Sequence, residues 1–167
     1  HLFFPGQGAF GDCMTKLRNL DLVDPIVEWI QADKPFFGIC IGYQLLFESS
    51  EESPGIDGLS ILEGKVIRFV EEGFKVPHMG WNGAKLQDPA CGPWTNLGAE
   101  PYFYFVHSYY PEPKDKAISA SATSYAGNFT SAIQRGRLVA TQFHPEKSQK
   151  AGMGLIQNFI NLEERED

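Results

Sequence analysis

Apolar and polar positions in the first third of the chain predict alternating strands and helices. The apolar run at residues 2–4 is stopped by Pro5-Gly6-Gln7-Gly8, which predicts a buried strand that ends in a tight glycine loop. Helical spacing of apolar side chains predicts a helix over residues 9–20, and a second helix is expected over residues 23–32. The apolar positions of the first helix are Phe10, Met14, Leu17 and Leu20.

A second apolar run covers residues 35–40, and helical spacing begins directly after it. This pattern predicts a buried strand followed at once by a helix over residues 41–48. Catalytic loops in α/β folds lie at the carboxyl ends of such strands. The turn between this strand and this helix is therefore the first place to look for chemistry.

From residue 65 onward the pattern becomes typical of strands separated by turns. Strands are expected at residues 65–70, 75–79, 102–106, 118–125, 129–134 and 138–143. An amphipathic helix over residues 151–162 closes the pattern, and residues 163–167 are expected to fray. Its apolar face comprises Leu155, Ile156, Phe159 and Ile160. The order of elements predicts one α/β domain over residues 1–167, with three layers, a mostly parallel central sheet flanked by helices, and an added antiparallel hairpin.

Composition narrows the classes of function. The chain has 167 residues, is 43% hydrophobic and carries a formal net charge of −7, which excludes intrinsic disorder and argues against binding to nucleic-acid phosphates. No apolar stretch approaches the ~20 residues that cross a bilayer. The three cysteines, Cys13, Cys40 and Cys91, lack the spacing of a disulfide framework or a zinc site. We therefore expect a protein of the reducing cytoplasm, without a metal.

The segment Gly38-Ile39-Cys40-Ile41-Gly42 has the form of a nucleophile elbow, G-x-C-x-G. In such an elbow, a strained turn presents the thiol at the edge of the sheet. The N-terminus of the following helix is expected to lower the thiol pKa, and the N–H of Ile41 would face a developing oxyanion. The alternative is that Cys40 is a buried structural cysteine.

A base for this nucleophile is available in His144-Pro145-Glu146, at the end of the last predicted strand. Pro145 favours an extended conformation at His144, which would place Glu146 on the same side of the chain as the imidazole. Cys40, His144 and Glu146 are then nucleophile, base and orienting group. The alternative is a surface histidine beside a solvated glutamate. Backbone N–H groups of the loop containing Gly6 and Gln7 are candidates to complete the oxyanion hole, although glycine pairs more often form plain turns.

The chain resembles the class I, triad-type glutamine amidotransferases, and within them the glutaminase subunits of imidazole glycerol phosphate synthases. The resemblance rests on the stretches at residues 38–50 and 144–148, together with those at residues 5–12, 76–82 and 104–110. It covers essentially the whole chain.

The resemblance implies that Cys40 attacks the side-chain amide of glutamine, forms a γ-glutamyl thioester and releases ammonia. It implies that Gly8, Gln44, Ser108 and Tyr109 bind glutamine. It further implies that Trp81, Tyr104 and Lys147 face a (β/α)8-barrel cyclase, which uses the ammonia to make imidazole glycerol phosphate, and that no cofactor is needed. Taken without the resemblance, each of these residues has an ordinary structural interpretation.

Three points remain open at this stage. Family members usually begin with a further strand, helix and strand, so we expect this chain to be truncated at its N-terminus and to lack sheet partners. They also carry a small aliphatic residue at the position of Gln7. The competing interpretations are another class I amidotransferase, serving GMP, anthranilate or carbamoyl phosphate synthesis, and a non-catalytic docking module. His78 and His107 are expected to be structural.

Overall fold

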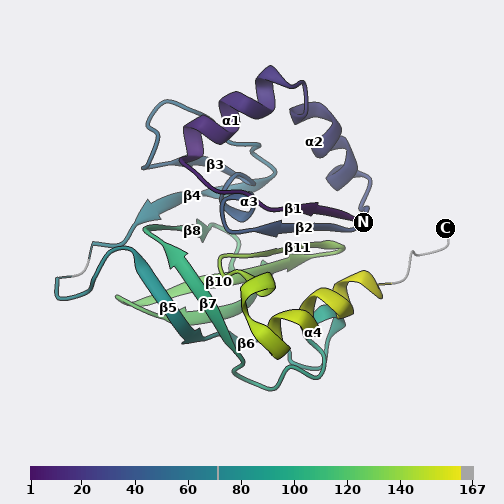
Figure 1. Cartoon of the computed structure of the whole chain (residues 1–167). Coiled ribbons are helices and arrows are strands. Elements are labelled where there is room, and N and C mark those ends of the chain that lie inside the picture. Colours follow the sequence, from purple (N-terminus) through teal and green to yellow (C-terminus); the bar gives the residue numbers. More distant parts are fainter. Residues whose placement is uncertain (71, 163–167) are drawn as a thin grey trace.

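A computed structural model describes residues 1–70 and 72–162 of the chain. Its largest element is a six-stranded sheet with strand order β1-β2-β11-β10-β9-β6 (Figure 1). The strands are β1 (Leu2–Phe4), β2 (Phe36–Ile39), β11 (Leu138–Thr141), β10 (Asn128–Arg135), β9 (Ser119–Ser124) and β6 (Lys85–Leu86). Strands β1, β2 and β11 are parallel, whereas β10, β9 and β6 continue the sheet with antiparallel pairing. The α/β class is confirmed, but the sheet is mixed rather than mostly parallel, because tight turns join β9, β10 and β11 as antiparallel neighbours and leave only β1, β2 and β11 parallel.

Helices cover both faces of this sheet. Helices α1 (Phe10–Asn19) and α2 (Val23–Gln31) lie on one face, and α4 (Gln149–Ile160) lies on the other (Figure 1). Because side chains alternate along a strand, the neighbours Phe36 and Phe37 of β2 enter two different cores. Phe36 packs in the core beneath α1 and α2, and Phe37 packs against Phe159 of α4. The three-layer prediction is therefore confirmed.

Two smaller sheets flank the main one. Strands β3 (Phe47–Ser50), β4 (Leu62–Arg68) and β8 (Tyr109–Pro113) form a three-stranded sheet in the order β3-β4-β8. Strands β5 (His78–Gly83) and β7 (Tyr102–His107) form an antiparallel two-stranded ribbon, although residues 84–101 separate them along the chain. The antiparallel hairpin expected from the sequence lies in the main sheet, where the consecutive strands β9, β10 and β11 pair antiparallel. Single 3₁₀ turns are η1 (Gly92–Trp94), η2 (Lys116–Ile118) and η3 (Pro145–Lys147).

The prediction of a helix over residues 41–48 is correct for the first turn and wrong for the rest. Helix α3 covers only Ile41–Gln44, and the chain enters β3 at Phe47. The carbonyls of Leu45 and Leu46 accept hydrogen bonds from residues 59 and 61 of the following loop and from residue 62 at the start of β4, rather than from a further helical turn. Leu46 and Phe47 are fully buried. Tertiary pairing of the apolar chain with β4 therefore overrides its local helical pattern.

Other element boundaries also differ from the sequence prediction. The strand expected at residues 75–79 begins at His78 and continues to Gly83, because pairing with β7 holds Gly80, Asn82 and Gly83 extended despite their low strand propensity. Strand β8 contains Pro111 and Pro113, which an edge strand tolerates, and it was not predicted.

Two of the apolar side chains that the sequence places in the core are exposed to solvent. Leu20 lies beyond the end of α1 and Ile160 lies on the outer side of α4, and both are exposed. Residues 163–167, expected to fray, lie outside the described residues. None of the helices at residues 1–70 and 72–162 is long and apolar enough to cross a membrane.

Candidate active site

Cys40 occupies the turn between β2 and α3 with φ 55° and ψ −108°, a conformation that non-glycine residues rarely adopt. The two flanking glycines are required by close backbone contacts. A Cβ atom at Gly42 would lie 1.9 Å from the carbonyl oxygen of Phe4, and one at Gly38 would lie 2.8 Å from that of Gly42. The G-x-C-x-G pattern thus forms the strained elbow that the sequence predicts.

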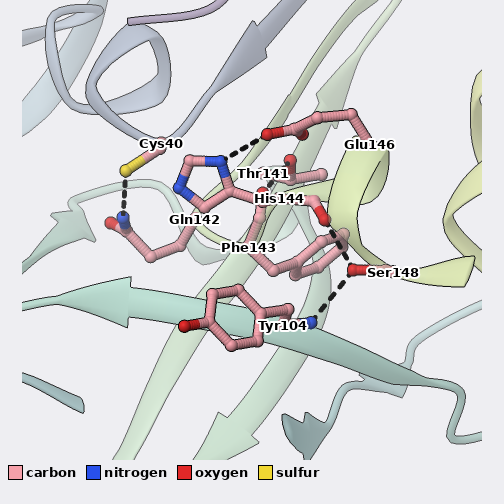
Figure 2. Close-up of polar contacts among 8 residues, drawn as sticks. All are labelled: Cys40, Tyr104, Thr141, Gln142, Phe143, His144, Glu146 and Ser148. Atoms are coloured by element: carbon pink, nitrogen blue, oxygen red, sulfur yellow. Dashed lines mark hydrogen bonds and ion pairs between the residues drawn. The ribbon is translucent and has the colours of Figure 1, made fainter. Parts of the chain in front are cut away.

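His144 follows β11, the strand beside β2, so base and nucleophile emerge from neighbouring parallel strands. The N–H of Cys40 donates to the carbonyl of Thr141 at 2.8 Å, and the N–H of His144 donates to the carbonyl of Tyr104 at 2.9 Å. The hydroxyl of Ser148 donates to the carbonyl of His144 at 2.5 Å and accepts the N–H of Tyr104 at 3.0 Å (Figure 2). The backbone of His144 is therefore fixed from both sides.

The imidazole of His144 lies between Cys40 and Glu146 (Figure 2). Its Nδ1 is 2.7 Å from Oε1 of Glu146, and its Nε2, on the side of Cys40, is buried with no hydrogen-bond partner in the described part of the chain. Glu146 reaches this position from the 3₁₀ turn η3, and not from the extended segment that the sequence indicates. A carboxylate on Nδ1 keeps a proton there and leaves Nε2 free to accept one.

The electrostatic expectation for Cys40 is wrong. Removal of the thiol from water raises the pKa of Cys40 to about 11, while the backbone N–H of Ile41 and the charge of Lys147 lower it by less. The expected lowering assumed a full helix at residues 41–48. Helix α3 is a single turn, so little dipole is available at its N-terminus. In the free protein the sulfur is therefore a thiol, and its attack on a substrate needs a base.

A cavity of about 480 Å³ opens in front of Cys40. Most of the residues predicted to act at the site line it, and Glu146 and Trp81 are the two that do not. The predicted residues in its lining are Gly6, Gln7, Gly8, Cys40, Ile41, Gln44, Tyr104, Ser108, Tyr109, His144 and Lys147. Glu146 lies behind the imidazole of His144, and Trp81 lies on the outer face of the ribbon, paired with Tyr104 at a ring separation of 6.3 Å.

Two residues that the sequence did not single out belong to this site. The amide of Gln142, fully buried, donates to Sγ of Cys40 at 3.7 Å and accepts a hydrogen bond from Gln44 at 3.1 Å. Glu52 lines the cavity and accepts the N–H of Phe10 at 2.8 Å, at the N-terminus of α1. Gln142 directly follows the buried strand β11 and lies two residues before the base, and this position in the sequence is the signal that points to it.

His78 and His107 form a buried pair beside the cavity, which His107 helps to line, with Nδ1 of His78 3.0 Å from Nε2 of His107. Burial lowers the pKa of His78 to about 4 and that of His107 to about 3. Both are therefore neutral at pH 7.

Acidification is expected to destabilise the fold through this pair. The unfolded state binds protons at pH 6.5 and the folded state does not, so the free energy of unfolding falls as pH decreases from 6.5 toward 3. Between pH 7 and 4.5, His107 accounts for about 2 to 3 kcal/mol of that loss. Urea unfolding of the parent chain and of His107→Phe at both pH values checks this. An equal loss in both proteins would contradict it.

A family model described as glutamine amidotransferase class-I matches residues 2–162. The chain therefore belongs to the class I glutamine amidotransferases. The "imidazole glycerol phosphate synthase subunit HisH" of Synechococcus elongatus is 50% identical over 161 residues, which cover 95% of this chain and 74% of that protein. The HisH subunit of Methylococcus capsulatus is 46% identical over 167 residues, which cover 96% and 76%.

A solved structure supports the same fold. The crystal structure of a glutamine amidotransferase matches with a TM-score of 0.69 at 16% identity, and the match covers 94% of this chain and 77% of that one. The groups of three or more histidine, cysteine or acidic side chains that hold metal ions do not occur among residues 1–70 and 72–162.

Proposed function

We propose that the protein hydrolyses glutamine to glutamate and ammonia with Cys40 as nucleophile, His144 as base and Glu146 as orienting group. One observation carries the proposal: the imidazole of His144 lies between Cys40 and Glu146, with Nδ1 engaged and the buried Nε2 on the side of the sulfur without a partner among residues 1–70 and 72–162 (Figure 2). An unpartnered buried nitrogen costs free energy that a purely structural histidine would avoid.

The chemistry follows from these positions. Nε2 of His144 takes the proton from Sγ of Cys40, and the sulfur attacks the amide carbon of glutamine. The resulting oxyanion is held by the N–H of Ile41 and by backbone N–H groups of the Gly6 and Gln7 loop. His144 then gives its proton to the leaving nitrogen, which departs as ammonia and leaves a γ-glutamyl thioester. A water molecule, deprotonated by Nε2 of His144, attacks the thioester carbon, the C–S bond breaks to release glutamate, and the proton on His144 returns to Sγ of Cys40.

The rest of the cavity suits the amino-acid part of glutamine. Gln44, Ser108 and Tyr109 supply amide, hydroxyl and backbone groups, and Gly8 leaves room for the ligand to approach the loop. The carboxylate of Glu52 suits the α-ammonium group. Gly6 packs against Ile41, since a Cβ atom there would lie 2.4 Å from the Ile41 side chain. The two candidate oxyanion segments are therefore adjacent.

We further propose that the ammonia passes to a (β/α)8-barrel cyclase for formation of imidazole glycerol phosphate in histidine biosynthesis. The support is the identity of 46 to 50% to HisH subunits and the outer face of the ribbon, where Trp81 and Tyr104 lie beside the mouth of the cavity with Lys147. In this proposal the protein forms a heterodimer with lyase activity in the cytoplasm, where Cys40 stays reduced.

The labelling of cysteines tests the identity of the nucleophile. A diazo-ketone analogue of glutamine is expected to modify Cys40 and to leave Cys13 and Cys91 unmodified, because Cys40 alone of the three lies beside His144 and the cavity that fits glutamine. Mass spectrometry locates the label, and excess glutamine should slow its attachment. Label found mainly on Cys13 or Cys91 would overturn the assignment, and Cys40→Ala is the control that should remain unlabelled.

A further inference from the structure

The β5–β7 ribbon has two chemically different faces. Directly paired residues point to the same side, and Trp81 with Tyr104 and Met79 with Val106 form an outer face on which Trp81 and Met79 are exposed. The alternate residues His78, Asn82 and His107 point inward, where both histidines are buried. A protein that binds the outer face therefore contacts the same two strands that carry these three polar side chains on the inner face.

Hydrogen bonds of the inner face run in one direction. The side-chain amide of Asn82 donates to the carbonyl of Ser124 at 3.1 Å, and its oxygen accepts the N–H of Gly83, so the amide orientation is fixed. Its second N–H faces Nε2 of His78 at 3.3 Å, which makes that nitrogen an acceptor. Nδ1 of His78 must then donate to Nε2 of His107.

Further hydrogen bonds continue from His107 into the active site. Nδ1 of His107 donates to the carbonyl of Tyr109 at 2.8 Å. This carbonyl also accepts a hydrogen bond from Gln44 at 3.0 Å. Gln44 donates its other N–H to Gln142, which donates to Sγ of Cys40. A continuous series of buried and part-buried hydrogen bonds thus joins the ribbon to the nucleophile.

We propose that this series, from Asn82 through His78 and His107 to Tyr109, Gln44, Gln142 and Cys40, couples occupation of the outer ribbon face to the alignment of the nucleophile. His78, Asn82, His107 and Gln142 are positioning residues in it. The inference rests on the proposed function and deepens it, because it names the route by which a docked cyclase changes glutamine hydrolysis.

The physical basis is that each link has a single arrangement. The two neutral histidines accept on Nε2 and donate from Nδ1, so turning either ring leaves a buried polar group without a partner. Because the rings cannot rotate without losing a hydrogen bond, a shift of β5 against β7 is passed on as a displacement of the carbonyl of Tyr109. Gln44, which donates to this carbonyl, moves with it. Both residues line the cavity.

The test compares variants in complex with the cyclase and its nucleotide ligand. His107→Phe keeps a ring among Phe69 and Phe105 but removes both hydrogen bonds, and Asn82→Leu removes the first donor. Saturating cyclase raises kcat in the parent chain, and each variant is expected to show about tenfold less of this stimulation. A factor of about ten corresponds to the net free energy of roughly one hydrogen bond. His107→Gln, which retains a donor and an acceptor, is expected to recover part of the stimulation.

Thr123→Val is the matched control, because it removes a buried hydrogen bond to Ser131 in the adjoining sheet, and the Thr123 hydroxyl is not one of the groups that form the series. It should lose stability and keep the stimulation of the parent chain. If folded His107→Phe and Asn82→Leu keep that stimulation within twofold, the coupling route is wrong. If the parent chain hydrolyses no glutamine with or without the cyclase, the proposed function itself fails, and the route fails with it.

Discussion

His144→Ala is expected to lower kcat for glutamine hydrolysis by a factor on the order of 10²–10⁴, the usual contribution of a general acid and base. The effect is large because the pKa of Cys40 is raised to about 11, so few thiolate groups form without a base at neutral pH. The variant is assayed by ammonia release at saturating glutamine in the presence of the cyclase. Parent-like activity of His144→Ala would exclude the proposed triad.

Glu146→Gln should have a smaller effect, about tenfold. Its amide can still accept or donate one hydrogen bond at Nδ1 of His144, but the negative charge that stabilises the imidazolium is lost. Glu63→Gln is a matched control, because Glu63 is an exposed carboxylate paired with Lys114. The control should leave activity unchanged.

Docking of the ligand-bound cyclase is expected to raise the glutaminase rate about 100-fold. The glycines on both sides of Gln7 allow its peptide groups to rotate, and the carbonyl of Gln7 accepts a hydrogen bond from the thiol of Cys13 at 3.6 Å. A loop that moves from about 1% to about 99% in the active orientation requires ~5.5 kcal/mol of differential binding.

Steady-state assays with and without the cyclase measure this stimulation. Trp81→Ala should reduce it, because the indole is exposed on the outer ribbon face. Met153→Ala, which removes an exposed side chain from α4, should not. Equal rates with and without ligand-bound cyclase would contradict the coupling even if the triad is correct.

The sequence identified those parts of the site that depend on local constraints. The elbow at Cys40 follows from two glycines that no larger residue can replace, and His144 follows from the end of a buried strand. Strand β3 was missed because Leu46 and Phe47 fit a buried helix as well as a buried strand. Only their pairing with β4, distant in the sequence, decides between the two.

The electrostatics of the site were not predictable in the same way. Whether the thiol of Cys40 is acidic depends on how much water reaches it and on the length of α3, and both are set by tertiary packing. Gln142 and Glu52 escaped notice because a single amide or carboxylate has no motif of its own. Both are recognised only when segments far apart in the chain come together around the cavity.

The hydrogen bond from the N–H of Cys40 to Thr141 has a consequence for how the enzyme loses activity on heating. It ties the nucleophile to the strand that precedes the base, at the carboxyl ends of two strands that each have neighbours on both sides in the six-stranded sheet. The amide proton of Cys40 should therefore exchange with solvent deuterium only when the whole domain opens, at the slow end of the scale for this chain. Cys40 and His144 then separate no earlier than the core unfolds, so thermal inactivation of the triad and global melting are a single event.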